Sequence, residues 1–287
     1  MMLIIGYLLV FLSMIGGFML AGGHPAVLLH LSEFVIIGGI ALGVLVIASP
    51  THVMKDLVRQ MLQALRGSAV KKDHYVQLLT ALYEIFMVAR RDGMIALEEH
   101  VVEPGKSPIF QRYDSVLADP VPLQFLCNGL KPIIDGKIKP DQLKSLFDSE
   151  LAAREAEDNE PVQILQLVGD SLPGIGIVAA VLGIINTMGA IADGPEKVGI
   201  KVAAALTGTF LGIYCAYGFV NPLANRVKLN NFGELRYLRC IAVSINSYAK
   251  GMAPLMAVEV GRRTLDSSVQ PTADELEEAI KAVKSAG

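Results

Sequence analysis

The sequence predicts an all-α integral membrane protein with four transmembrane helices, a helical cytoplasmic domain between the second and third of them, and a helical C-terminal cytoplasmic tail. Hydrophobic residues make up 52% of the 287 residues, yet 18% are charged. That balance is typical of a membrane protein with a large aqueous part. Four intervals carry no Asp, Glu, Lys or Arg, and each exceeds the roughly 20 helical residues that cross a bilayer. No apolar run alternates with a period of two between turn residues, so a sheet is not expected.

The four predicted spans cover residues 1–23, 34–54, 171–192 and 202–225. The first has no basic segment before its apolar run, and a second apolar interval follows closely. A secretory signal peptide has a basic N-terminal region. The first span is therefore predicted to be a retained helix.

Basic residues set the predicted orientation. All but two of the 25 Lys and Arg lie in 51–167 and 223–287, and the short connections between paired spans hold just Lys197 and Lys201. Loops rich in Lys and Arg stay on the cytoplasmic side. Both termini and both charged stretches are therefore expected in the cytoplasm.

The two cytoplasmic parts, 55–167 and 226–287, are predicted to be helical. Apolar residues recur every three or four positions over 73–90, as on one face of a helix. Pro161 follows an acidic stretch and is expected to end a helix over 141–157. Thr272 and Glu275 form a capping-box pattern that should begin the last helix.

The sequence contains no complete motif for an enzyme active site, a cofactor site or a metal site. The GxGxxA match at 174–179 has no strand before it and continues as an apolar run. No HExxH pair or nucleophile elbow is present, and the three cysteines form no CxxC pair. The net charge of −3 and the sparse aromatic residues do not suit nucleic acid. The sequence therefore predicts no enzyme activity, no cofactor, no metal site and no nucleic-acid binding.

Charged groups are almost absent from the spans. Apart from Glu33 and Asp170 at span edges, no carboxylate, Lys or Arg lies within them. Proteins that carry protons across membranes normally place an ionisable group near mid-bilayer. Either the protein moves no ions, or a partner supplies the carboxylate. Thr209 offers a mid-span hydroxyl, although a threonine in a membrane helix usually bonds to its own backbone.

Prolines and small residues interrupt the last two spans. Pro173 lies four residues after Gly169, and Pro222 lies four after Gly218. A proline inside a helix leaves the carbonyl four residues earlier unpaired, so the two pairs predict matched kinks. Alternatively, Pro173 lies in the first turn of a helix capped by Asp170 or Ser171.

Small residues four apart also predict close helix packing in lipid. They are Gly39 with Gly43, Ala179 with Gly183, and Gly208 with Gly212.

Several stretches together resemble one family. They are VGDSLP at 168–173, GTFLG at 208–212 with AYGF and Pro222 after it, and AVE at 257–259 followed by GRRTL. Along essentially the whole chain, the sequence resembles the MotA/PomA family of flagellar motor stator subunits, which is related to ExbB and TolQ. The resemblance implies a homo-oligomeric ring, a pentamer, in the lipid of the bacterial inner membrane. Two MotB-type single-span subunits inside the ring would supply the ion-carrying aspartate, and the ring would drive the rotor protein FliG.

The resemblance also assigns roles to residues. It implies that Arg90 and Glu98 face the rotor, that Pro173 and Pro222 couple ion flow to movement, and that Thr209 lies on the ion path. Ala180 stands where sodium-driven relatives carry threonine, which implies proton transport.

Three alternatives remain open. The charges around Gly93 also fit a solvated helix boundary. The chain also fits an ExbB- or TolQ-like energiser of an outer-membrane process, although those proteins usually have three spans. A small secondary transporter is the third, although no inverted repeat of interrupted helices is visible.

Overall fold

The computed structural model describes residues 2–67 and 70–286, and these residues contain helices, turns and loops but no strand. They divide into two compact units. Unit 1 comprises 1–68 with 157–230, and unit 2 comprises 69–156 with 231–287. Helices α8 (Pro140–Met188) and α10 (Asn221–Ala249) contribute residues to both units.

Four helices in the described part of the chain are long and apolar enough to cross a membrane. The first two are α1 (Met2–Leu20) and α2 (Leu31–Ala48). The third lies in α8, and the fourth begins with α9 (Pro195–Cys215) and runs on into α10. They correspond to the four apolar intervals of the sequence.

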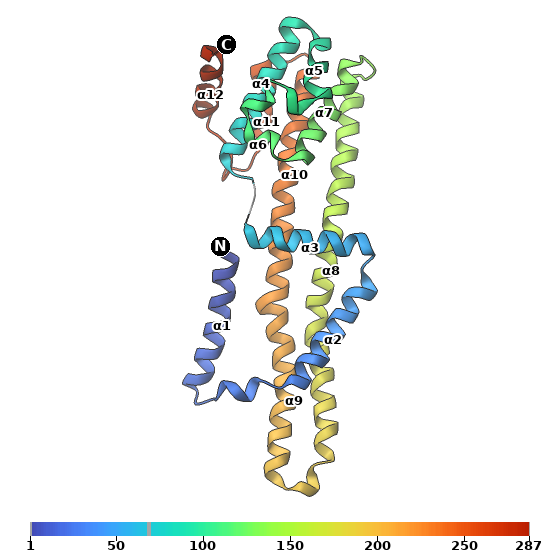
Figure 1. Cartoon of the computed structure of the whole chain (residues 1–287), viewed down its shortest axis with the longest axis vertical. Coiled ribbons are helices and arrows are strands. Elements are labelled where there is room, and N and C mark those ends of the chain that lie inside the picture. The colour runs from blue at the N-terminus through green and yellow to red at the C-terminus, as the bar shows by residue number, and fades with distance from the viewer. Residues whose placement is uncertain (1, 68–69, 287) are drawn as a thin grey trace. The chain divides into compact units, whose positions relative to one another are not determined.

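Small residues bring α8 and α9 into close contact in unit 1 (Figure 1). A Cβ on Gly176 would lie 2.9 Å from the carbonyl oxygen of Gly208, and one on Gly183 would lie 2.7 Å from the Ala205 Cβ. Such spacing lets backbones approach where lipid provides no hydrophobic drive. By contrast, a Cβ on Gly39 or Gly43 would meet no described atom within 4 Å.

Helix α3 (Thr51–Arg66) begins where the sequence predicted the second span to continue. Pro50 explains the break, because a proline disfavours helical geometry at the residue before it. Ser49 is accordingly extended, with φ −114° and ψ 118°. Helix α3 is amphipathic and lies across α8 and α10 within unit 1 (Figure 1). Its buried Leu57 packs with Leu165 and Ala224.

The expectation that Pro161 ends a helix is wrong, because α8 continues through it. A proline inside a helix loses one backbone hydrogen bond. Here the next residue, Val162, is buried in a cluster with Ala64 and Val227. Packing of this kind stabilises the helix across the proline and outweighs local propensity.

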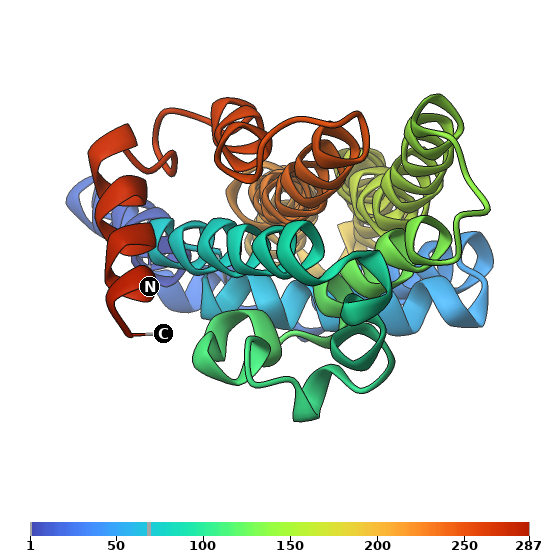
Figure 2. The same ribbon diagram turned by 90° about the horizontal axis from the view of Figure 1, so that it is seen from above.

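Helix α4 (Lys72–Asp92) forms the centre of unit 2, and it confirms the helix predicted over 73–90. It contacts the C-terminal helices α11 (Pro254–Arg263) and α12 (Ala273–Ala286) and the short helix α6 (Asp114–Leu117). Figure 2 shows α12, in dark red, at one end of α4. Phe86 of α4 stacks on Tyr248 with ring centroids 4.4 Å apart. The buried Glu84 accepts hydrogen bonds from Arg112 and Tyr113.

Short helices connect these elements. They are the 3-10 turns η1 (Pro25–Leu28), η2 (Met94–Leu97), η3 (Pro104–Lys106), η4 (Phe110–Arg112) and η5 (Ile191–Asp193), and the α-helices α5 (Glu98–Val102) and α7 (Pro120–Ile134).

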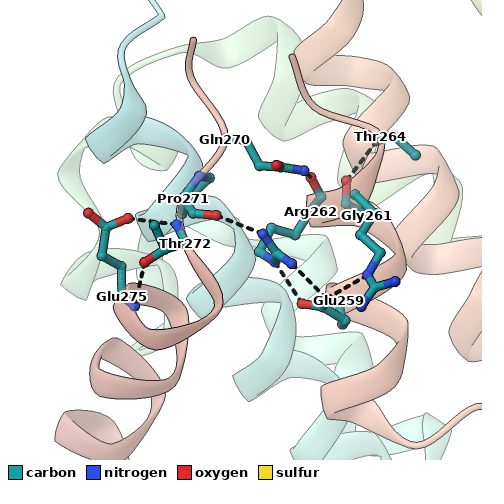
Figure 3. A network of polar contacts seen from close by, with 9 residues as sticks. Glu259, Gly261, Arg262, Thr264, Gln270, Pro271, Thr272 and Glu275 are labelled. Atoms are coloured by element: carbon teal, nitrogen blue, oxygen red, sulfur yellow. Dashed lines mark hydrogen bonds and ion pairs between the residues drawn. The ribbon is translucent and has the colours of Figure 1, made fainter. Parts of the chain in front are cut away.

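A polar network joins α11 to the start of α12 (Figure 3). Arg262 donates two hydrogen bonds of 2.7 Å to Glu259 and one of 2.8 Å to the carbonyl of Pro271. The predicted capping box is confirmed: the Thr272 amide donates to Glu275 Oε2 at 2.7 Å, and the Glu275 amide donates to Thr272 Oγ1 at 3.2 Å. These contacts fix where the last helix begins.

Candidate functional site

The two Gly–Pro segments meet in unit 1. Gly169 is buried against Asn221, the residue before Pro222: a Cβ on Gly169 would collide with Asn221 Oδ1 and lie 2.9 Å from its Cγ. The Asn221 amide nitrogen also donates a 3.2 Å hydrogen bond to Asp170 Oδ1. The proline-bearing segments of α8 and α10 are therefore in direct contact.

The helix just before Pro222 departs from α-geometry. The segment η6 (Ala216–Val220) is a single π-helical turn, and the Asn221 amide donates to the Ala216 carbonyl five residues earlier. Pro222 has no N–H to give to Gly218 four residues before it. Single π-turns inside longer helices are frequent at functional sites. Gly218 itself faces α1, where a Cβ would lie 3.0 Å from Val10 Cγ1.

Pro173 lies deep inside α8, so the alternative that places it in the first turn of a capped helix is wrong. The reason is that the helix does not stop before the span. Ser171, proposed as a cap, instead donates a 2.7 Å bond to the Leu167 carbonyl four residues earlier. Unlike the region before Pro222, the residues around Pro173 remain α-helical throughout.

The two predicted ion-path residues lie beside the contact of α8 with α9 at Gly176 and Gly208. Thr209 Cα would lie 3.3 Å from a Cβ on Gly176, and Ala180 N would lie 3.4 Å from one on Gly208. Ala180 is buried and Thr209 is half-buried.

The hydroxyls near this contact differ in their bonding. Thr187 and Thr207 bond back to the carbonyls of Gly183 and Ala203, at 2.8 and 3.0 Å. Within the described residues, Thr209 forms no such bond. Its hydroxyl is therefore available to another group.

The predicted rotor-facing charges lie in unit 2, on either side of a sharp turn. Helix α4 ends at Asp92 and is followed by Gly93, whose φ of +89° is a conformation that glycine adopts readily. Arg90 and Glu98 are exposed, and neither forms an ion pair among the described residues. Their neighbours are engaged: Arg91 bonds Asp92 at 2.8 Å.

Glu99, the neighbour of Glu98, lies 3.6 Å from the Nε2 of His100. Glu98 also borders a surface hollow of about 610 Å³. It is lined by Ile95, Ala96, Glu98, Glu99, Val102 and Glu103. The hollow thus combines apolar walls with three carboxylates.

Two residues at these contacts were not singled out from the sequence as site residues. Asn221 gave no signal apart from its place before Pro222. Glu33 was recognised as a charge at a span edge, but the structure buries it against α9, where a Cβ on Gly208 would lie 2.6 Å from its Oε2. A carboxylate in an otherwise uncharged span was the available signal.

Comparison with known proteins places the chain in a family. Residues 4–93 match the family described as Motility protein A N-terminal, and residues 118–239 match the MotA/TolQ/ExbB proton channel family. Motility protein A of Salmonella typhimurium is 38% identical over 285 residues, which cover 99% of this chain and 96% of that protein.

Two solved structures have the same fold. A structure of C. jejuni MotAB matches with a TM-score of 0.78 and 23% identity, and the match covers 94% of this chain and 98% of that one. The flagellar MotAB stator complex from Bacillus subtilis matches with a TM-score of 0.75 and 24% identity, with the same coverage. The full-length similarity to Motility protein A and the match to its N-terminal region together show that the chain belongs to the motility protein A family.

Proposed function

We propose that this chain is the A-type stator subunit of a bacterial flagellar motor. With a MotB-type single-span subunit it forms a proton-conducting complex in the inner membrane and converts proton flow into torque on the rotor protein FliG. The observation that carries the proposal is the contact between Gly169 and Asn221. It joins the two proline-bearing segments, so a movement at one is transmitted to the other.

The MotB-type partner supplies the carboxylate that carries the proton. Residues 171–188 of α8 include no ionisable side chain, and neither do residues 202–213 of α9. Proton carriers need such a group near mid-bilayer, so an aspartate of the MotB-type subunit takes this role. Thr209, whose hydroxyl is not bonded to its own helix in the described residues, and the small Ala180 line the path. Ala180 stands where sodium-driven relatives carry threonine, which supports protons as the transported ion.

Arrangement in the membrane follows from charge. The basic residues outside the spans place both termini and the segment 55–167 in the cytoplasm. There, Arg90 and Glu98 face the rotor. The chain forms a homo-oligomeric ring, a pentamer, around the MotB-type subunits. The match to the motility-specific N-terminal family favours this function over an ExbB- or TolQ-like one.

The test is complementation. The gene for this chain, expressed together with its MotB-type partner in a strain that lacks stator units, should restore swimming in soft agar. Rotation of tethered cells should stop when the proton gradient is collapsed and continue when sodium is replaced by potassium. Absence of rotation with the protein present in the membrane would refute a stator role, and arrest on sodium withdrawal alone would refute proton coupling.

A further inference from the structure

Glu33, in the first turn of α2, is the most deeply buried carboxylate of unit 1 among the described residues, at 4% exposure. Its Oε2 has no hydrogen-bond partner in the described chain. Its Oε1 receives one long contact, 3.5 Å from the Ser32 hydroxyl. The carboxylate is therefore enclosed but barely satisfied.

Glycine at position 208 makes room for this carboxylate. A Cβ there would lie 2.6 Å from Glu33 Oε2 and 3.1 Å from the Ala179 Cβ. Glu33 thus lies against the α9 backbone directly beside Thr209, at the contact that also holds Ala180. The group sits within the path assigned to the proton.

An acidic residue in the first turn of a helix does not need to be buried as Glu33 is. Glu196 occupies the first turn of α9, just as Glu33 occupies that of α2, and it is exposed. Favourable interaction with the positive end of a helix is available to an exposed carboxylate as well. The helix end alone does not explain why Glu33 is enclosed.

The surroundings do not suit a carboxylate anion. An ionised carboxylate without a cation or hydrogen bonds is strongly disfavoured in an apolar site, whereas a neutral acid is tolerated much better. The facing segment of α8, 171–188, holds no ionisable residue. On α9 the ionisable side chains nearest to Gly208 lie six or seven residues away, about 10 Å along the helix. They are Lys201, Tyr214 and Cys215, and Lys201 points its ammonium to the Asn186 carbonyl at 3.3 Å.

One titratable group lies closer. His30 precedes Glu33 by one helical turn at the start of α2, and its Nε2 is also buried without a partner in the described residues. Among the residues of α2 and its N-cap, His30 is the titratable group nearest to Glu33 along the chain.

We propose that Glu33 is a proton-binding site of this chain, an inference that rests on the proposed proton-conducting function. It holds a proton as a neutral carboxylic acid while α2 packs on α9 at Gly208. When the helices separate, the Oε2–H bond breaks, the proton passes to water, and a solvated carboxylate remains. Reprotonation reverses the step and restores the contact.

Infrared spectroscopy of the intact complex with its MotB-type partner in lipid tests the protonation state. At neutral pH the difference between the spectra of the wild type and of Glu33→Gln should contain the carbonyl stretch of a protonated carboxylic acid, because the substitution removes the contribution of Glu33 to that band. The matched variant Glu196→Gln, at the exposed first-turn acid of α9, should keep it. A spectrum unchanged by Glu33→Gln would overturn the proposal, whatever the complex does in the motor.

Rotation tests the role of the proton. Glu33→Gln keeps the neutral shape but cannot release a proton, so the complex should assemble and lose rotation, while Glu196→Gln should rotate as the wild type does. Glu33→Asp, which can still titrate, should restore part of the speed. Wild-type speed of Glu33→Gln would overturn the proposal. Failure of the wild-type complex to rotate would instead refute the stator function, and the infrared test would still decide the proton site.

Discussion

Gly169 packs directly on Asn221, so that the residue four before Pro173 touches the residue one before Pro222. An alanine at Gly169 would force its methyl group into the Asn221 side chain. Overpacking of this kind costs about 1–3 kcal/mol. We expect Gly169→Ala to lower the thermal stability of the purified complex and to slow rotation.

The matched control is Gly174→Ala on the same helix, where a Cβ meets no described atom within 4 Å. Replacing a glycine inside a helix by alanine stabilises it by about 0.5–1 kcal/mol when space allows. Removing the obstructing side chain should rescue the first variant, so Gly169→Ala with Asn221→Ala should be more stable than Gly169→Ala alone. A fluorescence-monitored thermal melt measures the stability of all of these variants. Equal melting temperatures of Gly169→Ala and Gly174→Ala would contradict the contact.

Pro222 follows the π-turn Ala216–Val220. With alanine at position 222, a backbone N–H becomes available to the Gly218 carbonyl, and a regular α-helix is favoured by one hydrogen bond. We expect Pro222→Ala to assemble normally but to rotate more slowly under load, because the irregular turn is lost.

Pro195→Ala is the control for that substitution, since Pro195 occupies the first turn of α9, where a missing N–H leaves no partner unpaired. Bead-rotation measurements compare the two variants. Wild-type speed of Pro222→Ala across loads would show that the proline has no part in movement.

Much of unit 1 was predictable from the sequence because membrane spans depend on composition over about 20 residues. The sequence also shows where the helix-breaking prolines lie, but it does not show whether each of them ends a helix. Pro50 ends a helix, whereas Pro161 and Pro173 are both carried inside α8. What decides is the packing around each proline, such as the burial of Val162 with Ala64 and Val227.

Contacts between distant segments were the part that the sequence left unresolved. Asp170 and Asn221 are 51 positions apart, and no local pattern relates them. Likewise, the charge of Glu33 is visible in the sequence, but the opening at Gly208 that receives it depends on how α2 meets α9. Glycines in spans were expected to pack, and the structure shows which of them face a neighbouring helix within the chain.

The charges around Gly93 offer a sharp test of rotor contact. Arg90 and Glu98 have no ion pair among the described residues, whereas the adjacent Arg91 and Glu99 lie next to Asp92 and His100. We expect Arg90→Glu and Glu98→Lys to reduce swimming strongly without lowering the amount of protein in the membrane. Exposed substitutions usually change stability by less than about 0.5 kcal/mol, so folding should be unaffected.

Arg91→Glu and Glu99→Lys are the matched controls, because they reverse neighbouring exposed charges. Swimming in soft agar, with membrane fractions probed by antibody, separates loss of torque from loss of protein. If Arg91→Glu and Glu99→Lys reduce swimming as strongly as Arg90→Glu and Glu98→Lys, the stretch acts as a general charged surface. The assignment of rotor contact to Arg90 and Glu98 then fails.

Glu259 gives unit 2 a pH-dependent stability. Hydrogen bonds from Arg262, and further ones from Arg263, lower the pKa of the Glu259 carboxyl from 4.5 to about 2. The side chains of Glu259 and Arg262 are 19% and 11% exposed, so solvent screens the pair only in part. Because the folded pKa is the lower one, the stabilisation is fully present above about pH 4.5 and is lost as pH falls through about 2.

Glu259→Gln should therefore destabilise the protein by about 2 kcal/mol near neutral pH, since each pKa unit corresponds to about 1.4 kcal/mol and screening reduces the total. The difference between wild type and variant should shrink as the pH is lowered from about 5 toward 3, because the wild-type carboxylate approaches protonation. Thermal melts of the purified complex at a series of pH values measure this difference in stability. The exposed Glu278, on α12, supplies the control variant Glu278→Gln, whose offset from the wild type should stay small throughout. A constant gap between wild type and Glu259→Gln at every pH would mean that the pair stabilises α11 through packing and not through its charge.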